Sequence, residues 1–277
     1  LKKIKNYSII TLTMPLPNIS LNPKLSAVID LTLNIMALLL ITKLSSWLWF
    51  LILFFSRQLL WLILTGFTYY PKTALRVKHY LSLLVFSLGM YLTIVFTDWP
   101  VALYILMTAF LILSFISFWF LPQSKIQFNI FLKPYTRWRF LISSLGLAGI
   151  LIGIQSIVFY QVLFTVNHWL WHILTACVSS LMAFWWWYEY GIKLEKRIFI
   201  ASAAFFILMI ELAWIITALP IGNIASGLIL TWSWYLIWLL NRFNLTAEGI
   251  KWLKQTKFLL ANLAIFALFL IFIVRWR

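Results

Sequence analysis

The feature that most constrains this chain is a series of apolar stretches, each about twenty residues long, which covers most of the sequence between residues 26 and 274. A helix needs about twenty residues to cross the hydrocarbon core of a bilayer. Hydrophobic residues make up 64% of the chain and charged residues only 10%, which excludes a water-soluble domain. The sequence therefore predicts an all-α fold, a polytopic transmembrane helix bundle.

The apolar stretches define nine spans and divide the chain into three parts. We expect a leader over 1–25, an N-terminal helix pair over 26–70, and a seven-helix bundle over 79–277. The second span has an alternative, in which two short interfacial helices are broken at Ser56-Arg57-Gln58. The expected spans are 26–43, 46–69, 79–97, 99–121, 139–163, 168–190, 198–219, 223–241 and 258–274.

Six of these spans form a repeat of helical hairpins, over 79–121, 139–190 and 198–241. Each hairpin begins after a basic loop and turns within a few residues. Its second span starts at Asp98, Asn167 or Asn223 and ends rich in aromatic residues. Asp and Asn side chains accept hydrogen bonds from the free N–H groups at a helix start, so we expect these three residues to be N-caps.

The basic residues predict the orientation of the protein in a cell membrane. If the leader is cytoplasmic, 18 of the 22 Lys and Arg residues fall on the cytoplasmic side. This agrees with the positive-inside rule and places the C-terminus outside. The net charge of +16 then reflects contact with anionic lipid headgroups and not with nucleic acid. The 18 residues are Lys2, Lys3, Lys5, Lys24, Lys72, Arg76, Lys78, Lys125, Lys133, Arg137, Arg139, Lys193, Lys196, Arg197, Arg242, Lys251, Lys254 and Lys257.

Glu211 is the first candidate functional residue, because it stands well inside the span 198–219. Thr231 and Ser233 lie near the same depth in the following antiparallel span. Ionisable side chains in hydrocarbon are costly and mark functional sites. We therefore expect a buried, protonated carboxyl that is an ion or proton site, or that locks one helix pair through hydrogen bonds.

Asp30 and Arg57 are a second candidate pair, on the first two spans. An arginine in the middle of a membrane is expensive unless it is paired. An ion pair between Asp30 and Arg57 is the simplest arrangement that lowers this cost.

Two basic segments could contact anionic lipid. Lys133, Arg137 and Arg139 could hold a lipid phosphate, although the positive-inside rule accounts for them equally well. Lys251 and Lys254 would face headgroups from an interfacial helix that starts at Thr246. A simple basic linker is the alternative for that second segment.

His168 and His172 are weak candidates for a metal site. Their spacing of four residues puts both on one helix face, but two ligands make only half of a site. The chain has six acidic residues and one cysteine, and it contains no sequence motif of known chemistry. We therefore expect no metal and no cofactor.

One part of the chain resembles a known group of proteins. The residues that carry the resemblance are 211–214 (Glu-Leu-Ala-Trp), the Leu-Pro pair at 219–220, 227–231 (Gly-Leu-Ile-Leu-Thr) and Tyr235. This segment resembles uncharacterised multi-pass membrane proteins of small-genome candidate-phylum bacteria. The resemblance covers some 30 residues and implies a membrane bundle without an assigned activity.

These observations favour a non-enzymatic membrane protein that acts in transport or as a structural component of an assembly. Its partners would be membrane lipids, and either another membrane protein or a second copy of the chain. The alternative is a membrane-embedded enzyme that acts on a lipid-linked or prenyl phosphate at the cytoplasmic face. A cytoplasmic cleft lined by Lys133, Arg137 and Arg139 would favour the enzyme. A mid-membrane cavity that reaches Glu211 would favour transport, and a packed bundle without a cavity would favour a structural role.

Overall fold

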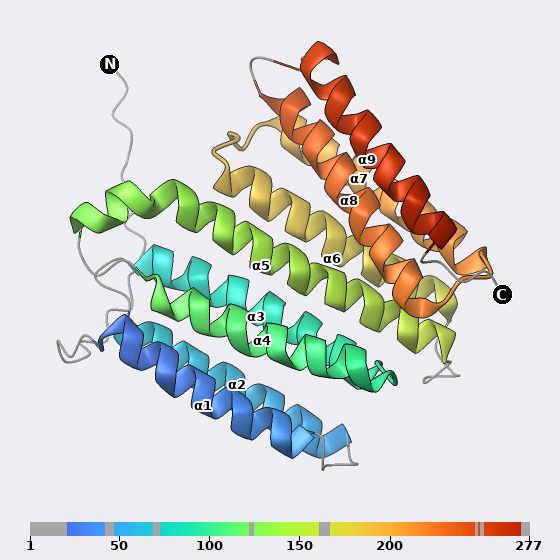
Figure 1. Ribbon diagram of the computed structural model, residues 1–277. Coiled ribbons are helices and arrows are strands. Elements are labelled where there is room, and N and C mark those ends of the chain that lie inside the picture. The colour runs from blue at the N-terminus through green and yellow to red at the C-terminus, as the bar shows by residue number, and fades with distance from the viewer. Residues whose placement is uncertain are drawn as a thin grey trace, which may run out of the picture.

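The protein is an all-α bundle of antiparallel helices (Figure 1). The computed structural model describes residues 21–41, 47–68, 73–121, 125–160, 167–246, 249 and 252–272. The helices in these residues are α1 (Pro23–Ile41), α2 (Trp47–Thr68), α3 (Thr73–Val95), α4 (Pro100–Trp119), α5 (Lys125–Phe159), α6 (His168–Glu189), α7 (Lys196–Ala218), α8 (Asn223–Leu245) and α9 (Trp252–Phe272).

The helices match the predicted spans because length and apolarity determine both. Eight helices, α1 to α8, are long and apolar enough to cross a membrane, so the chain is a multi-pass membrane protein. The described part of α9 offers a shorter apolar stretch, Gln255–Ile271, where the sequence predicts a ninth span. α2 is one continuous helix, so the alternative of two interfacial helices broken at Arg57 is wrong.

Apart from the buried Arg57, the basic residues of the described helices gather at one end of the bundle. This end, where α1, α3, α5, α7 and α9 begin, is called the basic end; the other end is called the neutral end. Every exposed Lys or Arg among the described side chains lies at the basic end: Lys24, Arg137, Lys193, Lys196, Arg197 and Lys257.

Two cores lie on either side of α5. Buried side chains of α1 to α4, with Tyr135 and Ile142 of α5, form the first core. Buried side chains of α5 to α8 form the second, which is rich in tryptophan. α9 lies at the far edge (Figure 1), and none of its described side chains is buried.

Helix α5 joins the two halves through close backbone contact with α3. A Cβ atom added to Gly89 of α3 would overlap the carbonyl group of Gly146, and one added to Gly149 would overlap that of Gly89. Gly149 and Gly153 of α5 are four residues apart, and small residues at this spacing let two membrane helices approach closely. A side chain at any of these positions would push α3 and α5 apart.

Two helix boundaries differ from expectation. α5 begins at Lys125 and contains Pro134, whereas the predicted span starts at residue 139. α8 ends at Leu245 with Thr246 as its C-cap, and Gly249 has a left-handed backbone, so no interfacial helix begins at Thr246. Residues 247–248 and 250–251 of that expected helix lie outside the described residues. Asn167 does cap α6, with its side chain accepting a hydrogen bond from the Trp169 N–H. Trp99 and Gly222 are the caps of α4 and α8, where Asp98 and Asn223 were expected.

Candidate functional site

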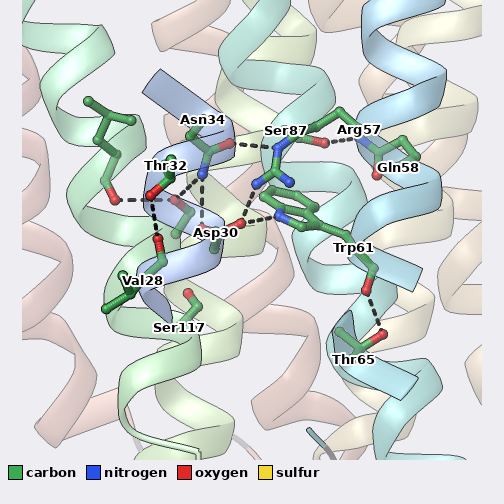
Figure 2. Close-up of polar contacts among 12 residues, drawn as sticks. Val28, Asp30, Thr32, Asn34, Arg57, Gln58, Trp61, Thr65, Ser87 and Ser117 are labelled. Carbon is green, nitrogen blue, oxygen red and sulfur yellow. Dashed lines mark hydrogen bonds and ion pairs between the residues drawn. The ribbon is translucent and has the colours of Figure 1, made fainter. Parts of the chain in front are cut away.

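The structure brings Asp30 and Arg57 together, as the sequence predicts. The Arg57 guanidinium forms an ion pair with the Asp30 carboxylate, and the two side chains are 2% and 0% exposed. The same helix faces supply further partners, because Asn34 follows Asp30 by one turn of α1 and Trp61 follows Arg57 by one turn of α2. Figure 2 shows these four side chains pointing toward one another.

Hydrogen bonds satisfy both oxygens of Asp30. One oxygen accepts from Arg57 and from the Trp61 indole, and the other accepts from the Asn34 amide at 2.9 Å. Arg57 Nε also donates to Asn34 Oδ1 at 2.7 Å, and Asn34 donates to Ser114 Oγ of α4 at 2.8 Å. The network is electrically neutral, and it connects α1, α2 and α4. Such an arrangement holds helices together.

A second buried ion cluster lies at the basic end. Glu189, the last residue of α6, lies 2.8 Å from Lys78 Nζ and 3.4 Å from Arg139 Nη1. Arg139 is 2% exposed and also donates to Ser82 Oγ at 3.2 Å and to the Lys78 carbonyl at 3.0 Å. The cluster therefore connects α3, α5 and α6. The sequence does not mark Glu189 as a candidate, because the residue follows an aromatic run that is typical of the end of a span.

This cluster removes Arg139 from the lipid-phosphate contact that was expected of Lys133, Arg137 and Arg139. Arg139 points into the bundle, where Glu189 neutralises it, while Arg137 is exposed. Tyr135 is buried and hydrogen-bonds to His79. Lys133 lies in α5 and Lys254 in α9, but their side chains, like Lys251, lie outside the described residues.

Glu211 is exposed, so the expectation that it is buried is wrong. The buried face of α7 carries Phe205, Met209, Ala213 and Ile216, and Glu211 lies on the opposite face. No hydrogen bond or ion pair joins Glu211 to the described residues. Thr231 donates to the Gly227 carbonyl at 2.7 Å, and Ser233 lies in a groove between α8 and α9. The structure therefore does not bring Thr231 and Ser233 to Glu211.

The two candidate metal ligands have different surroundings. His168 is exposed at the start of α6, whereas His172 is buried and packs edge-on against Trp169. No group of three metal-ligating His, Cys, Asp or Glu side chains occurs in the part of the chain that the structure describes. The pair has no third ligand there.

An apolar groove of about 550 Å³ lies between α5, α8 and α9. Phe266 and Phe269 of α9 contact Trp232 of α8, with ring centres 5.6 Å and 6.3 Å apart. The groove is open on one side. Its lining is Phe140, Leu141, Ser144, Leu145, Ala148, Leu228, Thr231, Trp232, Trp234, Tyr235, Asn262 and Phe269.

Aromatic and cationic side chains gather where the groove approaches the basic end. Phe140 and Tyr235 line the groove, and Phe140 stacks on Trp238 with the ring centres 4.6 Å apart. One turn beyond Trp238, the Arg242 guanidinium carbon lies 3.8 Å from the centre of the Tyr190 ring. Burial raises the pKa of Tyr190, and the positive charges of Arg242 and Arg137 oppose this increase because both lie near the phenol. Arg242 and Tyr190 are not part of the apolar lining, and they lie beyond its Phe140 and Tyr235 end toward the basic end.

The chain matches no protein-family profile, and neither a curated protein sequence nor a solved structure is significantly similar to it.

Proposed function

We propose that this multi-pass membrane protein binds an anionic lipid. The lipid chain occupies the groove between α5, α8 and α9, and the phosphate-bearing headgroup lies beside Arg242 at the basic end. The observation that carries the proposal is an open groove with an almost entirely apolar lining, beyond whose Phe140 end the Arg242 guanidinium lies 5.7 Å from the centre of the Trp238 ring. Its volume is in the range of about 300–1,000 Å³ that small-molecule sites usually have.

The lining of the groove suits a flexible apolar chain. Most of the side chains are aliphatic or aromatic, and the polar ones, Ser144, Thr231 and Asn262, are uncharged. Thr231 and Asn262 also bond to backbone carbonyls of their own helices. A lipid chain therefore makes apolar contacts in the groove that are similar to those it makes in the bilayer. The headgroup contacts then determine which lipid is preferred.

Binding of an anionic lipid would serve a role in transport or as a structural component of a membrane assembly. The alternative of an enzyme for lipid-linked or prenyl phosphate has weaker support, since Arg139 is held by Glu189 and Ser82. A prenyl chain and an acyl chain share the same apolar chemistry, so the identity of the bound chain must come from experiment.

The groove is tested by the lipids that purify with the protein. Parent protein in mild detergent should retain an anionic lipid that mass spectrometry identifies as acyl or prenyl. Ala148→Trp should fill the groove and remove that lipid, whereas Ala264→Trp, the same change at an exposed position of α9, should retain it. Equal lipid retention by both variants would refute the groove as the binding site.

The headgroup contact is tested by changing one cation. Arg242→Gln should lower the preference for anionic over zwitterionic lipid about fivefold, since a cation near a membrane surface contributes about 1 kcal/mol. Lys257→Gln removes an exposed charge of α9, also at the basic end of the bundle, and should leave the lipid preference unchanged. If both variants lose the preference equally, the effect is general attraction to the membrane and Arg242 has no special role.

A further inference from the structure

A small pocket lies at the neutral end, where α5 and α7 end and α8 begins. Its volume is about 200 Å³. Leu219 and Pro220, in the turn between α7 and α8, are exposed and form part of its wall, so the pocket lies near the surface of this end. None of the described residues that line it is charged. It shares no lining residue with the groove between α5, α8 and α9, so the two sites are separate.

Gln155 of α5 lines this pocket with a buried amide. The residue is 3% exposed and lies four residues before the end of α5, about 6 Å inside the neutral end at 1.5 Å per residue. Its Nε2 makes no hydrogen bond to the described residues. Buried polar groups are nearly always hydrogen-bonded, because a group that leaves water without finding a new partner is destabilising. A ligand in the pocket can supply the missing bond.

Asn223, at the start of α8, brings a second amide to the pocket. Its Nδ2 donates to Ser156 Oγ of α5 at 2.7 Å, and Ser156 Oγ donates to the Ile152 carbonyl at 2.8 Å. These bonds engage the nitrogen of the Asn223 amide and leave its oxygen to accept from a ligand. One turn further along α8, a Cβ atom added to Gly227 would lie 2.5 Å from Ile152 Cα. Close packing therefore holds α5 and α8 in place beside the pocket.

We propose that this pocket binds a small uncharged molecule that carries a primary carboxamide group. A carboxamide accepts hydrogen bonds at its oxygen and donates them from its nitrogen, so it can bond to the Gln155 amide and to Asn223 Oδ1 at the same time. A hydroxyl group would have to make both bonds from a single atom. A charged ligand would lose its hydration without meeting a counter-charge in the lining.

The rest of the pocket limits the size and the polarity of this molecule. Val158, Phe159 and Ile216 contribute apolar side chains to the wall, which suits a short aliphatic or aromatic body. The volume corresponds to about seven water molecules at about 30 Å³ each, so the ligand is small. This site is independent of the lipid groove, and its test does not depend on lipid binding.

Binding of isobutyramide to the full chain in lipid nanodiscs tests the pocket, with saturation-transfer NMR as the measurement. Isobutyrate has nearly the same shape but carries a charge, and it should bind at least about tenfold more weakly. Val158→Trp should fill the pocket and abolish binding of isobutyramide. Ala218→Trp is the matched control, because Ala218 is exposed near the same end and does not line the pocket, so binding should persist.

The role of the buried amide is tested by Gln155→Leu. This variant removes a polar group that has no described partner, so it should unfold at no lower a temperature than the parent. It should bind isobutyramide about three- to tenfold more weakly, as expected from the loss of one hydrogen bond. A parent protein that gives no signal with isobutyramide has a pocket for water only, which would overturn the proposal. Equal binding by the parent and Gln155→Leu, or by the two Trp variants, would overturn it as well.

Discussion

Arg57 shows how one side chain can determine the arrangement of several membrane helices. Its charge is costly inside the bundle, and the ion pair with Asp30 and the hydrogen bond to Asn34 offset that cost only when α1 and α2 lie in one register. The guanidinium also lies 4.5 Å from the centre of the Trp61 ring, a cation–π contact. The network therefore contributes specificity of packing in addition to stability.

Removing one charge of this pair should destabilise the protein more than removing both. Asp30→Ala or Arg57→Ala alone leaves a buried charge without its partner, which costs about 3–5 kcal/mol in comparable buried pairs. The double variant removes both charges and should recover a large part of that loss. Thermal unfolding in detergent measures the three variants, and losses that simply add would contradict direct coupling.

Glu189 should be essential for the packing of α3, α5 and α6, because it neutralises Lys78 and the buried Arg139. We expect Glu189→Gln to lower the stability by about 3 kcal/mol, since Arg139 would remain buried without a counter-charge. Glu195→Gln is the matched control, because Glu195 is exposed six residues later. Unfolding temperatures that fall equally in both variants would contradict the structural role of Glu189.

At the scale of whole elements, the sequence predicts where helices occur better than which faces they bury. The existence of α1 to α8 follows from the length of the apolar stretches. In α7, however, the face toward lipid and the face toward the core are equally apolar, so the pattern alone could not show that Glu211 points outward. The start of α5 at Lys125 could not be predicted from apolar length, because the helix extends beyond the apolar stretch and continues through Pro134.

The contact of α3 with α5 gives a prediction for the element scale. Gly89→Ala places a methyl group on the carbonyl of Gly146, so the two helices must separate, and overpacking of this kind typically costs about 1–3 kcal/mol. Gly222→Ala is the control, since a Cβ atom there meets nothing within 4 Å. The thermal unfolding temperature should fall for Gly89→Ala only. Equal unfolding temperatures would show that the contact tolerates a methyl group.

At the scale of the whole molecule, α5 is the element shared by two packed halves, α1 to α4 and α6 to α8. The sequence could not predict this division, because it depends on which helices share a core and not on which are adjacent in the chain. The predicted hairpins α3–α4, α5–α6 and α7–α8 are pairs of neighbours in sequence, and their interpretation as a repeat stays a prediction. The Asp30–Arg57 pair could be predicted because two opposite charges on successive spans have few other ways to be neutralised.

The orientation of the molecule gives the last prediction, since all exposed described cations lie at the basic end. The positive-inside rule places this end in the cytoplasm. In a Cys177→Ala background, Pro220→Cys on the exposed turn between α7 and α8 should react with a membrane-impermeant maleimide applied to intact cells. Lys193→Cys, on the exposed turn between α6 and α7, should react only after the cells are made permeable. The opposite labelling would place the basic end outside, and would also place the proposed headgroup contact of Arg242 in the outer leaflet.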